Sequence, residues 1–284
     1  MLGHPIAHSV SPPMHNAALA GLARRDRTFA AWRYFRFDVP PDALPDALDR
    51  LHAANFFGLN LTVPHKVIAF DRVVEIDPDA VPVGAVNTLL RTPRGWRGHN
   101  TDGYGLATAV REDLGIDLAG THVLLVGAGG AARAAAVECL RRGCASLAIA
   151  NRTSANLDAL LAVLAPVVRA TGILARGFTP TTAPVDLPAG TLVINATSLG
   201  LRESDTAPID LAALPRPAGV FDMIYNPPQT ALLRAAAALG IPHADGLSML
   251  VHQGAKSLEI WSGIPAAQTA PAMHTAARAA LAGR

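Results

Sequence analysis

The stretch T-H-V-L-L-V-G-A-G-G-A-A-R-A-A-A-V-E-C, from Thr121 to Cys139, decides the fold. Within it, 123–126 is a short, continuous apolar run, typical of a strand buried on both faces. The residues at 127–132 then read G-x-G-x-x-A, and the alanine-rich segment after them predicts a helix that ends at Gly143. These glycines allow a tight turn and let a pyrophosphate approach the helix N-terminus, where free N–H groups attract anions. The motif alone also fits an ordinary strand–helix turn, so the flanking strand and helix are what favour a dinucleotide site.

Strands and helices continue to alternate beyond this turn. Polar or small residues follow several apolar runs, and helical segments separate them. The pattern predicts strands at 147–150, 191–196 and 220–224, with helices at 154–164 and 230–239. This alternation predicts a doubly wound α/β domain whose strand ends face a ligand crevice.

The end of the second strand indicates which dinucleotide is bound. A fold specific for NAD usually carries Asp or Glu about 20 residues past the glycines, where the acid binds the ribose hydroxyls. This chain has Asn151, Arg152 and Thr153 there, which suit a 2′-phosphate. NADP is therefore favoured over NAD.

Composition excludes several classes of protein. The formal net charge of +2 over 284 residues argues against a nucleic-acid-binding protein. Cys139 and Cys144 lack the spacing of a disulfide framework or metal site, and the ten histidines form no metal-binding motif, so we predict no metal. No segment resembles a signal peptide, and no apolar run approaches the roughly 18 residues of a membrane span. We expect a soluble cytoplasmic protein.

Lysine is rare in this chain, because the 24 basic residues include only Lys66 and Lys256. An ammonium group can lose its proton whereas a guanidinium cannot, so a retained lysine can mark proton-transfer chemistry. Pro64 starts a predicted helix, which sets Lys66 beside the positive end of the helix dipole and eases loss of its proton. A lone lysine is more often a solvated charge. Lys66 however belongs to a closely spaced polar set with Asn60, Thr62 and His65, which favours a role as a general acid–base.

Two further polar positions precede predicted helices. Ser9 and Ser11 stand at i and i+2, so in an extended segment both hydroxyls face one side. Ser11 is predicted to cap a helix that starts at Pro12; the pair could grip a carboxylate or provide a simple helix cap. Asp102 opens another helix and alone would be an ordinary first-turn acid, but beside Lys66 it would form a proton-transfer pair.

The remaining segments complete the coarse organisation. An aromatic strand is predicted at 29–37 and a second strand at 58–63, with a helix between them. The other predictions are a hairpin turning at 93–95, a loop from Thr179 to Ala189, and two C-terminal helices at 245–261 and 265–282.

Eight motifs in this order make the chain resemble the shikimate dehydrogenase family. They are S-V-S at 9–11, N-L-T-V-P-H-K at 60–66, G-A-V-N-T at 84–88, N-T-D-G at 100–103, G-A-G-G-A at 127–131, N-R-T at 151–153, N-A-T-S at 195–198 and D-G-L-S-M-L-V-H-Q at 245–253. Each motif is modest evidence, whereas the ordered set covers nearly the whole chain.

The resemblance implies two domains around a deep cleft. Residues 1–102 and 247–284 would form an α/β substrate domain completed by C-terminal helices, and 103–246 a Rossmann-like, doubly wound NADP-binding domain. The implied reaction is reversible hydride transfer between NADPH and 3-dehydroshikimate, which gives shikimate. Lys66 and Asp102 would be the catalytic pair. The implied substrate-binding residues are Ser9, Ser11, Thr62, Asn87, Tyr225 and Gln253.

The implied cofactor-binding residues come from four separate segments. They are Gly127, Ala128, Gly129, Gly130, Ala131, Asn151, Arg152, Thr153, Thr197, Ser198, Gly246 and Met249. Asn156 stands where many NADP-using members carry a basic residue, so selectivity for the 2′-phosphate would rest mostly on Arg152.

Three alternatives stay open. A relative within the family could prefer quinate or an amino-substituted shikimate, possibly with NAD, although Ser11 argues against quinate because its users often carry Thr there. A non-catalytic NADP-sensing protein is opposed by the presence of Lys66 and Asp102.

We expect a monomer or homodimer whose partner is a small-molecule substrate.

Overall fold

The computed structural model describes residues 1–179 and 186–283, so the predicted loop from Thr179 to Ala189 lies mostly outside the described residues. The chain divides into two compact units, one made of Met1–Thr101 with Leu250–Arg284 and the other of Asp102–Met249. The assignment of one ligand to each unit, and of a cleft between them, stays a prediction.

The first unit is built on a small mixed sheet. Antiparallel β5 (Thr88–Thr92) and β6 (Gly95–His99) form the predicted hairpin, and β3 (Gly58–Asn60) and β4 (Glu75–Ile76) complete the order β3-β5-β6-β4. A parallel pair, β1 (Leu2–Gly3) and β2 (Phe37–Asp38), joins it through a bridge between Leu2 and Leu61. Helix α3 (His65–Phe70) follows β3 directly.

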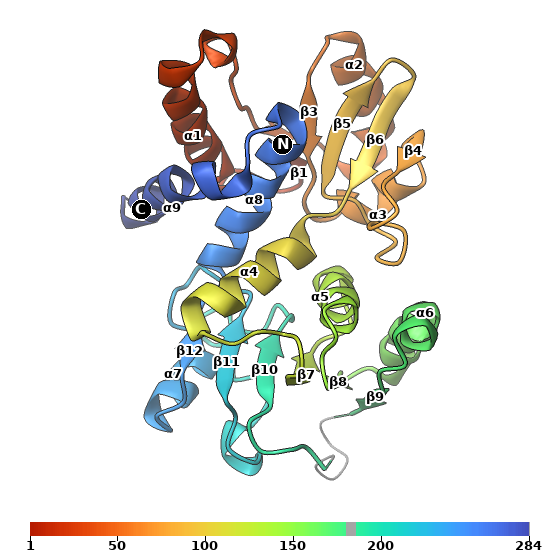
Figure 1. Cartoon of the computed structure of the whole chain (residues 1–284), viewed down its shortest axis with the longest axis vertical. Helices are drawn as coiled ribbons and strands as arrows, with labels where there is room; N and C mark the ends of the chain where they lie inside the picture. Colours follow the sequence, from red (N-terminus) through yellow and green to blue (C-terminus); the bar gives the residue numbers. More distant parts are fainter. Residues whose placement is uncertain (180–185, 284) are drawn as a thin grey trace. The chain divides into compact units, whose positions relative to one another are not determined.

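Helices surround this sheet (Figure 1). Helix α1 (Ser11–Arg25) packs against the C-terminal helix α9 (Ala266–Ala282). Helix α2 (Leu44–Ala53) buries Leu44 and Leu48 in a core shared with Leu59, Leu89 and Trp96. Helix α8 (Leu247–Ser262) contributes its residues from 250 onward to this unit.

The predicted aromatic strand at 29–37 is wrong. The segment instead contains a 3-10 turn at Arg27–Phe29 and only two strand residues, at Phe37–Asp38. Trp32 instead packs against other rings: its centroid lies 5.2 Å from that of Phe29, edge to face, and 4.8 Å from that of Phe57, which precedes β3. Aromatic content therefore reflected a ring cluster, not strand pairing.

The second unit is a parallel six-stranded sheet in the order β12-β11-β10-β7-β8-β9. The first strand to form in sequence, β7 (His122–Val126), lies in the centre, and the chain adds strands outward on both sides of it. The others are β8 (Ser146–Ala150), β9 (Ala175–Phe178), β10 (Leu192–Asn195), β11 (Gly219–Asp222) and β12 (His243–Ala244). This is the doubly wound dinucleotide-binding order, so the predicted fold class is confirmed.

Helices α4 (Asp102–Leu114), α5 (Gly130–Arg141) and α6 (Ser154–Thr171) pack in a row within this unit, and α7 (Ala231–Ala238) connects β11 to β12 (Figure 1). The prediction ended α6 at residue 164, which is wrong. The helix continues through Pro166 and ends where Gly172 adopts a left-handed conformation at φ 70°. The short strands β9 and β12 were not predicted.

Helix α6 has 18 residues and a mean hydropathy of 1.2, which by length and composition alone would suffice to cross a membrane. Core helices of α/β proteins pass the same test. One face of α6 is buried through Leu157, Leu160 and Leu164, and a Cβ at Gly177 on β9 would lie 2.8 Å from Leu157. The helix therefore covers the sheet edge.

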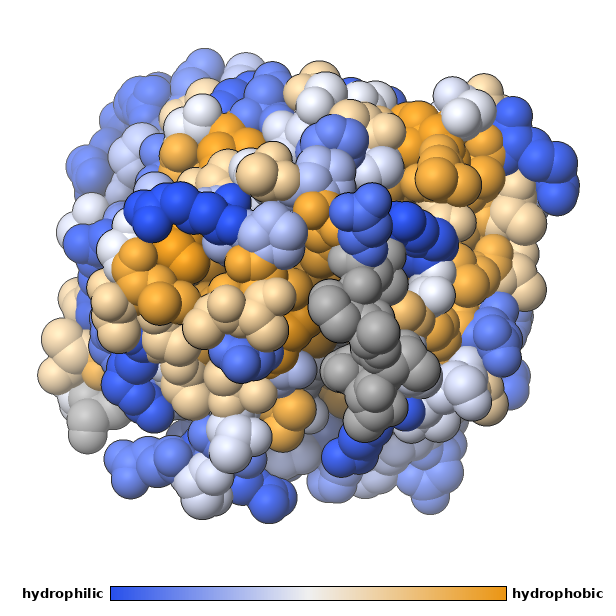
Figure 2. Space-filling view, turned by 90° about the horizontal axis from the view of Figure 1, so that it is seen from below, coloured by the Kyte–Doolittle hydropathy of each residue, from blue (hydrophilic) through white to orange (hydrophobic). Residues whose placement is uncertain are grey.

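The molecular face in Figure 2 shows hydrophobic and hydrophilic residues side by side.

Candidate active site

A buried polar network in the first unit centres on Asn87, which is 1% exposed and directly precedes β5. Its Nδ2 donates to Thr101 Oγ1 (2.9 Å) and to Gln253 Oε1 (3.3 Å). Its Oδ1 accepts from the Thr101 backbone N–H and from the Thr88 hydroxyl, each at 2.9 Å. Partners from three segments therefore fix the orientation of this amide, and two predicted substrate residues, Asn87 and Gln253, are brought together.

A second buried amide, Asn60, supports the first. Its Nδ2 donates to Ser257 Oγ (2.9 Å) and to Thr88 Oγ1 (3.1 Å), and its Oδ1 accepts from the Tyr34 hydroxyl (2.7 Å). Ser257 lies 2.7 Å from Thr88 and donates to the Gln253 carbonyl (2.9 Å). Burial raises the pKa of Tyr34, which keeps it a neutral donor. Sequence reasoning missed Tyr34, Thr88, Thr101 and Ser257, because their shared role depends on contacts between distant segments.

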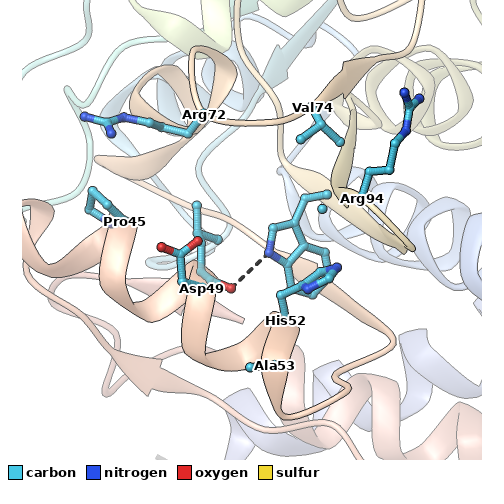
Figure 3. A pocket seen from close by; sticks show the side chains of 10 residues that line it. Pro45, Asp49, His52, Ala53, Arg72, Val74 and Arg94 are labelled. Carbon is cyan, nitrogen blue, oxygen red and sulfur yellow. Dashed lines mark hydrogen bonds between the residues drawn. The ribbon is translucent and has the colours of Figure 1, made fainter.

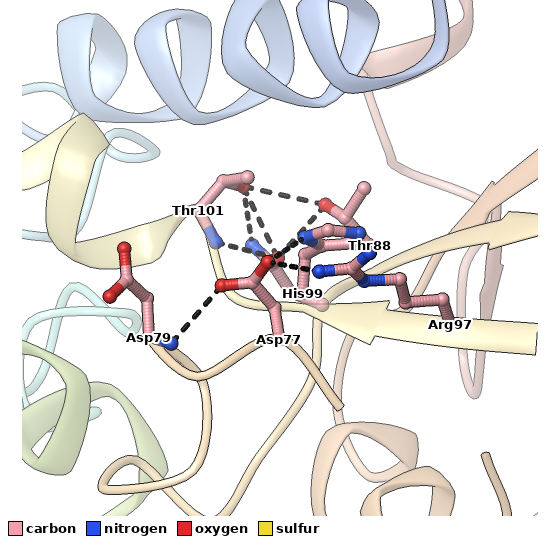
Figure 4. Close-up of polar contacts among 7 residues, drawn as sticks. Asp77, Asp79, Thr88, Arg97, His99 and Thr101 are labelled. Atoms are coloured by element: carbon pink, nitrogen blue, oxygen red, sulfur yellow. Dashed lines mark hydrogen bonds and ion pairs between the residues drawn. The ribbon is translucent and has the colours of Figure 1, made fainter. Parts of the chain in front are cut away.

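An ionic cluster lies next to this network (Figure 4). The Asp77 carboxylate is 3.1 Å from the Arg97 guanidinium and 3.3 Å from His99 Nδ1. Burial lowers the pKa of His99, and the nearby Asp77 opposes that shift. The His99 carbonyl accepts the Asn87 backbone N–H at 2.9 Å. The cluster therefore braces the strand β6 to which Asn87 is anchored.

Lys66 lies half-buried in the first turn of α3, as predicted from Pro64. Its backbone carbonyl accepts the N–H of Val86 (2.9 Å), which ties α3 to the segment that carries Asn87. Thr62 is also half-buried just before this helix. His65 is not part of the polar set: it is fully buried, its Nε2 donates to the Val39 carbonyl (2.9 Å), and burial lowers its pKa.

The Ser9–Ser11 segment differs from its prediction in one detail. Ser11 does not cap α1 but is its first residue and is 5% exposed. Ser9 supplies the cap-like contact, because its Oγ accepts the Ser11 N–H (3.2 Å) while its hydroxyl donates to the Met1 sulfur (3.1 Å). A thioether is a weak acceptor, so a ligand carboxylate could compete for the Ser9 hydroxyl.

Asp102 is 7% exposed and is the first residue of α4, at the start of the second unit. Lys66 belongs to the first unit, so their pairing stays a prediction. The same holds for the contact of Tyr225 with the substrate, and for the role of Gly246 and Met249 in cofactor binding. Tyr225 follows β11 and is half-buried.

The glycine turn of the second unit has the predicted form. Gly127 has φ 117°, and a Cβ there would lie 3.0 Å from the Ala196 carbonyl oxygen, so the position favours glycine. A Cβ at Gly129 or Gly130 would meet nothing within 4 Å. Open space therefore lies over the N-terminus of α5, where a pyrophosphate could approach the backbone. Ala128 and Ala131 complete this turn.

The predicted 2′-phosphate segment follows β8. Asn151 Nδ2 donates to the Thr153 carbonyl (2.8 Å), which holds the turn, while the side chains of Arg152 and Thr153 are exposed. The turn carries a cation and no acid, in keeping with a phosphate ligand.

The loop after β10 carries the predicted cofactor residues Thr197 and Ser198, and two strand-end residues that were missed, Asn195 and Asp222, hold it. Thr197 donates from its backbone N–H (3.0 Å) and hydroxyl (2.8 Å) to Asn195 Oδ1, and Asn195 Nδ2 in turn donates to Asp222 (2.9 Å). Ser198 is exposed in the same loop. A polar residue at the end of a buried strand was the available signal. Gly246 has a packing role as well, because a Cβ there would lie 2.1 Å from the Met223 carbonyl oxygen.

A cavity of about 330 Å³ between α2 and the β5–β6 hairpin lies apart from these residues (Figure 3). Trp96 forms part of its wall and donates from Nε1 to the Leu48 carbonyl (3.0 Å). Arg72 and Arg94 flank it on opposite sides. None of the predicted site residues lines this cavity.

Within residues 1–179 and 186–283, no group of His, Cys, Asp or Glu is arranged to hold a metal. Cys139 and Cys144 are free and buried, and burial raises the pKa of Cys144 to about 11. Neither thiol is therefore a ready nucleophile.

The sheet order, the glycine turn and the phosphate-suited segment are those of a dinucleotide-binding protein of the α/β class. The chain belongs to the shikimate dehydrogenase family. Residues 1–89 match the shikimate dehydrogenase substrate-binding domain and 246–278 match the shikimate 5′-dehydrogenase C-terminal domain. The predicted family and the predicted class, an oxidoreductase that uses NADP, are confirmed.

Three relatives illustrate the similarity. Shikimate dehydrogenase (NADP(+)) of Symbiobacterium thermophilum is 40% identical over 100% of this chain and 94% of its own. The shikimate 5-dehydrogenase of Thermus thermophilus, solved with NADP(H) and shikimate, is 34% identical with a TM-score of 0.82, covering 98% and 97% of the two chains. The 5-ketofructose reductase of Gluconobacter sp. strain CHM43 is 34% identical with a TM-score of 0.81, covering 96% of each.

Proposed function

We propose that this chain is an NADP-dependent shikimate dehydrogenase, which reversibly reduces 3-dehydroshikimate to shikimate on the route to chorismate and the aromatic amino acids. The observation that carries the proposal is the contact between Asn87 and Gln253, 166 positions apart in sequence. In the family both side chains bind ring hydroxyls. A ring hydroxyl, which both donates and accepts, could replace the hydrogen bond that the two amides make with each other.

The other substrate contacts are consistent with this role. Ser9 and Ser11 would hold the substrate carboxylate at the start of α1, where the helix dipole favours an anion. Thr62 would join the amides at the hydroxyls, and Tyr225 would contact the substrate near the cofactor. The rigid support of Asn87 by Thr88 and Thr101 means that little side-chain entropy is lost when a ligand binds.

Proton transfer falls to Lys66. When the substrate ketone becomes an alcohol, its oxygen gains negative charge and needs a proton. Lys66 as an ammonium stabilises this charge and donates the proton, and Asp102 positions the ammonium. In the reverse direction the neutral amine takes the hydroxyl proton.

NADPH, when bound, supplies the hydride. The residues of this chain fit such a ligand, because Gly129 and Gly130 leave the approach to α5 open and Arg152 offers a cation for the 2′-phosphate. Asn151 and Thr153 would hold the ribose side, and Thr197, Ser198, Gly246 and Met249 would line the nicotinamide side.

A cofactor-by-substrate activity matrix tests the proposal. Purified protein is assayed with shikimate and quinate against NADP⁺ and NAD⁺, and with 3-dehydroshikimate and 5-ketofructose against NADPH. We expect the highest kcat/KM with shikimate and NADP⁺. Absence of turnover with shikimate under either cofactor contradicts the proposal.

The matrix also separates the alternatives. Preference for quinate, or for 5-ketofructose as in the Gluconobacter neighbour's name, would assign another polyhydroxylated substrate to the same site. Binding of NADPH without turnover of any substrate would instead indicate a sensing protein.

We expect the protein to bind small molecules and to bind neither nucleic acid nor a membrane. We expect it to be a cytoplasmic monomer or homodimer. The formal net charge of +2 supports the exclusion of nucleic acid. Sedimentation velocity of the purified protein would distinguish the monomer from the dimer.

A further inference from the structure

Asp222 is a buried carboxylate to which no catalytic or binding role has been assigned above. It is the last residue of β11 and has 0% exposure. Its Oδ1 accepts from Asn195 Nδ2 (2.9 Å) and from the Ile224 backbone N–H (3.1 Å), and its Oδ2 accepts from the Thr230 hydroxyl (2.7 Å). All three hydrogen-bond partners are neutral, so the carboxylate is held by hydrogen bonds and not by an ion pair.

These hydrogen bonds connect Asp222 to the glycine turn. The Asn195 amide that donates to Asp222 accepts, on its other atom, both polar hydrogens of Thr197 (3.0 and 2.8 Å). A Cβ on Gly127 would lie 3.0 Å from the Ala196 carbonyl oxygen and 3.1 Å from Thr197 Cγ2. These side chains thus form a continuous path from Asp222 through Asn195 and Thr197 to the glycine turn, where the pyrophosphate would bind.

Asp222 holds the neighbouring loop as well. Ile224, which donates to the carboxylate, accepts the backbone N–H of Gly246 on its carbonyl (3.1 Å). Thr230 donates to the carboxylate and accepts the Leu233 N–H (3.3 Å), which caps α7. The loops after β10 and β11 both leave the carboxyl ends of their strands, which is where doubly wound sheets bind ligands.

The charge on this side chain disfavours folding. Burial raises the pKa of Asp222 even though three hydrogen bonds act in the opposite direction. Since the folded chain then binds this proton more tightly than the unfolded chain, ionisation of Asp222 above the unfolded pKa lowers the free energy of unfolding. Asp222 is buried at the carboxyl end of β11, where doubly wound sheets bind ligands, and its hydrogen bonds hold the loops that begin there, which points to a role in binding.

We propose that Asp222 is a positioning residue for the dinucleotide: it orients the Asn195 amide, and through it Thr197, against the glycine turn. The proposal rests on the proposed function only for the identity of the cofactor. Asp222 itself does not touch the cofactor in this scheme. Its effect therefore falls on cofactor affinity and leaves substrate affinity unchanged.

The experiment compares Asp222→Ala with Asp222→Asn. The amide keeps an oxygen for Asn195 and Ile224 and can donate to Thr230, whereas alanine removes all three contacts. We expect Asp222→Ala to raise the dissociation constant of NADPH about tenfold, as measured by fluorescence titration. The KM of this variant for NADP⁺ should rise by a similar factor. The KM for shikimate should stay at the wild-type value. Asp222→Asn should restore most of the lost affinity.

Asp210→Ala is the matched control. Asp210 lies in the same unit and its carboxylate also accepts a backbone N–H, from Ala212 (3.0 Å), but it is exposed. Its NADPH affinity should equal that of the wild type.

Unchanged NADPH affinity in Asp222→Ala, or an equal rise in both KM values, would overturn the positioning role. If Asp222→Ala does not fold, Thr230→Val removes one of the three donors with little change of shape, and an unchanged NADPH dissociation constant there would overturn the role instead. The titration needs no turnover. A wild type that binds NADPH but does not oxidise shikimate would contradict the proposed function and still leave this comparison valid.

Discussion

The two units build their candidate sites in different ways. In the first, amides and hydroxyls from β3, β5 and α8 hold one another through side-chain contacts such as Asn60–Ser257, between residues 197 positions apart. In the second, the turn at 127–131 is a contiguous sequence whose backbone itself would bind the proposed cofactor, with Gly127 at φ 117°. One site is an assembly of distant side chains, and the other is a local backbone shape.

The difference matches what the two proposed ligands would demand. A polyhydroxylated ring presents several donors and acceptors around its edge, so it needs polar side chains from several directions, each fixed by a buried neighbour. A pyrophosphate is a concentrated anion that backbone N–H groups at a single helix end can bind. Changes in the first unit should therefore act on chemistry and packing, and changes in the second on cofactor affinity.

Lys66→Ala should give the largest effect. Without the proton donor, kcat should fall by about 10²- to 10⁴-fold, because general acid–base catalysis contributes that much. The dissociation constants of shikimate and NADPH should change little. Stopped-flow turnover and equilibrium titration measure these quantities separately.

Lys256→Ala is the control, since Lys256 is the other lysine and pairs with Glu259 at 2.5 Å on α8. Its kcat should match the wild type. Near-normal turnover in Lys66→Ala would show that the proton-transfer role is wrong.

Acid should weaken the first unit through His15. Burial lowers the pKa of this ring from 6.5 to about 4, so between these values the folded chain binds fewer protons than the unfolded chain. Stability therefore rises with pH across this window, and lowering the pH from 6.5 to 4 should cost about 3 kcal/mol of unfolding free energy through this group. In His15→Phe this part of the pH dependence should vanish, while the stack on Tyr34 can persist.

Tryptophan fluorescence in urea measures the effect, because Trp32, Trp96 and Trp261 all lie in the first unit. Parallel stability curves for wild type and His15→Phe would contradict the assignment to His15.

Gly127→Ala should weaken cofactor binding in the second unit. The φ of 117° and the 3.0 Å approach to the Ala196 carbonyl oxygen strain any side chain there, at a cost of about 1–3 kcal/mol. Relief of this strain should move the turn and raise the dissociation constant of NADPH, measured by fluorescence titration. Binding of shikimate should be unaffected.

Gly120→Ala separates strain from cofactor binding. Gly120 also has a positive φ (70°), but a Cβ there would meet nothing within 4 Å. It should lose some stability and keep its NADPH affinity; an equal loss of affinity in both variants would refute the special role of the turn.

Ser257→Ala should give the smallest effect. The substitution removes the Ser257 hydroxyl contacts with Asn60, Thr88 and the Gln253 carbonyl. Because Asn60 Nδ2 keeps Thr88 Oγ1 and the Asn87 carbonyl as acceptors, the free energy of unfolding should fall by only about 1–2 kcal/mol, with a modest rise in the KM for shikimate. Chemical denaturation measures the first and steady-state kinetics the second. Ser262→Ala on the same helix removes a hydrogen bond to the Leu258 carbonyl and one from the Ile264 N–H, neither of which involves the Asn60–Thr88 network, so the KM for shikimate should stay at the wild-type value.

The sequence by itself was sufficient to predict the doubly wound fold and the cofactor turn. Both predictions rest on residues that follow one another directly in the sequence. These are the apolar run that forms β7, the glycine turn, and the alanine-rich segment that forms α5. The same holds for Lys66, whose place in α3 follows from Pro64. Local errors arose where tertiary packing overrode propensity, as in the ring cluster at Trp32 and the continuation of α6 through Pro166.

Only the tertiary structure decided how the polar residues support one another. Thr88, Thr101 and Ser257 are ordinary in sequence, and His65 lies beside Lys66 in a polar motif yet points into the core. Whether Ser11 or Ser9 would satisfy the α1 N-terminus likewise depended on the packing of that segment. The physical reason is the sequence separation of the residues that interact. Secondary structure and turns arise from neighbouring residues, whereas a buried hydrogen-bond network is satisfied only when distant segments have folded together.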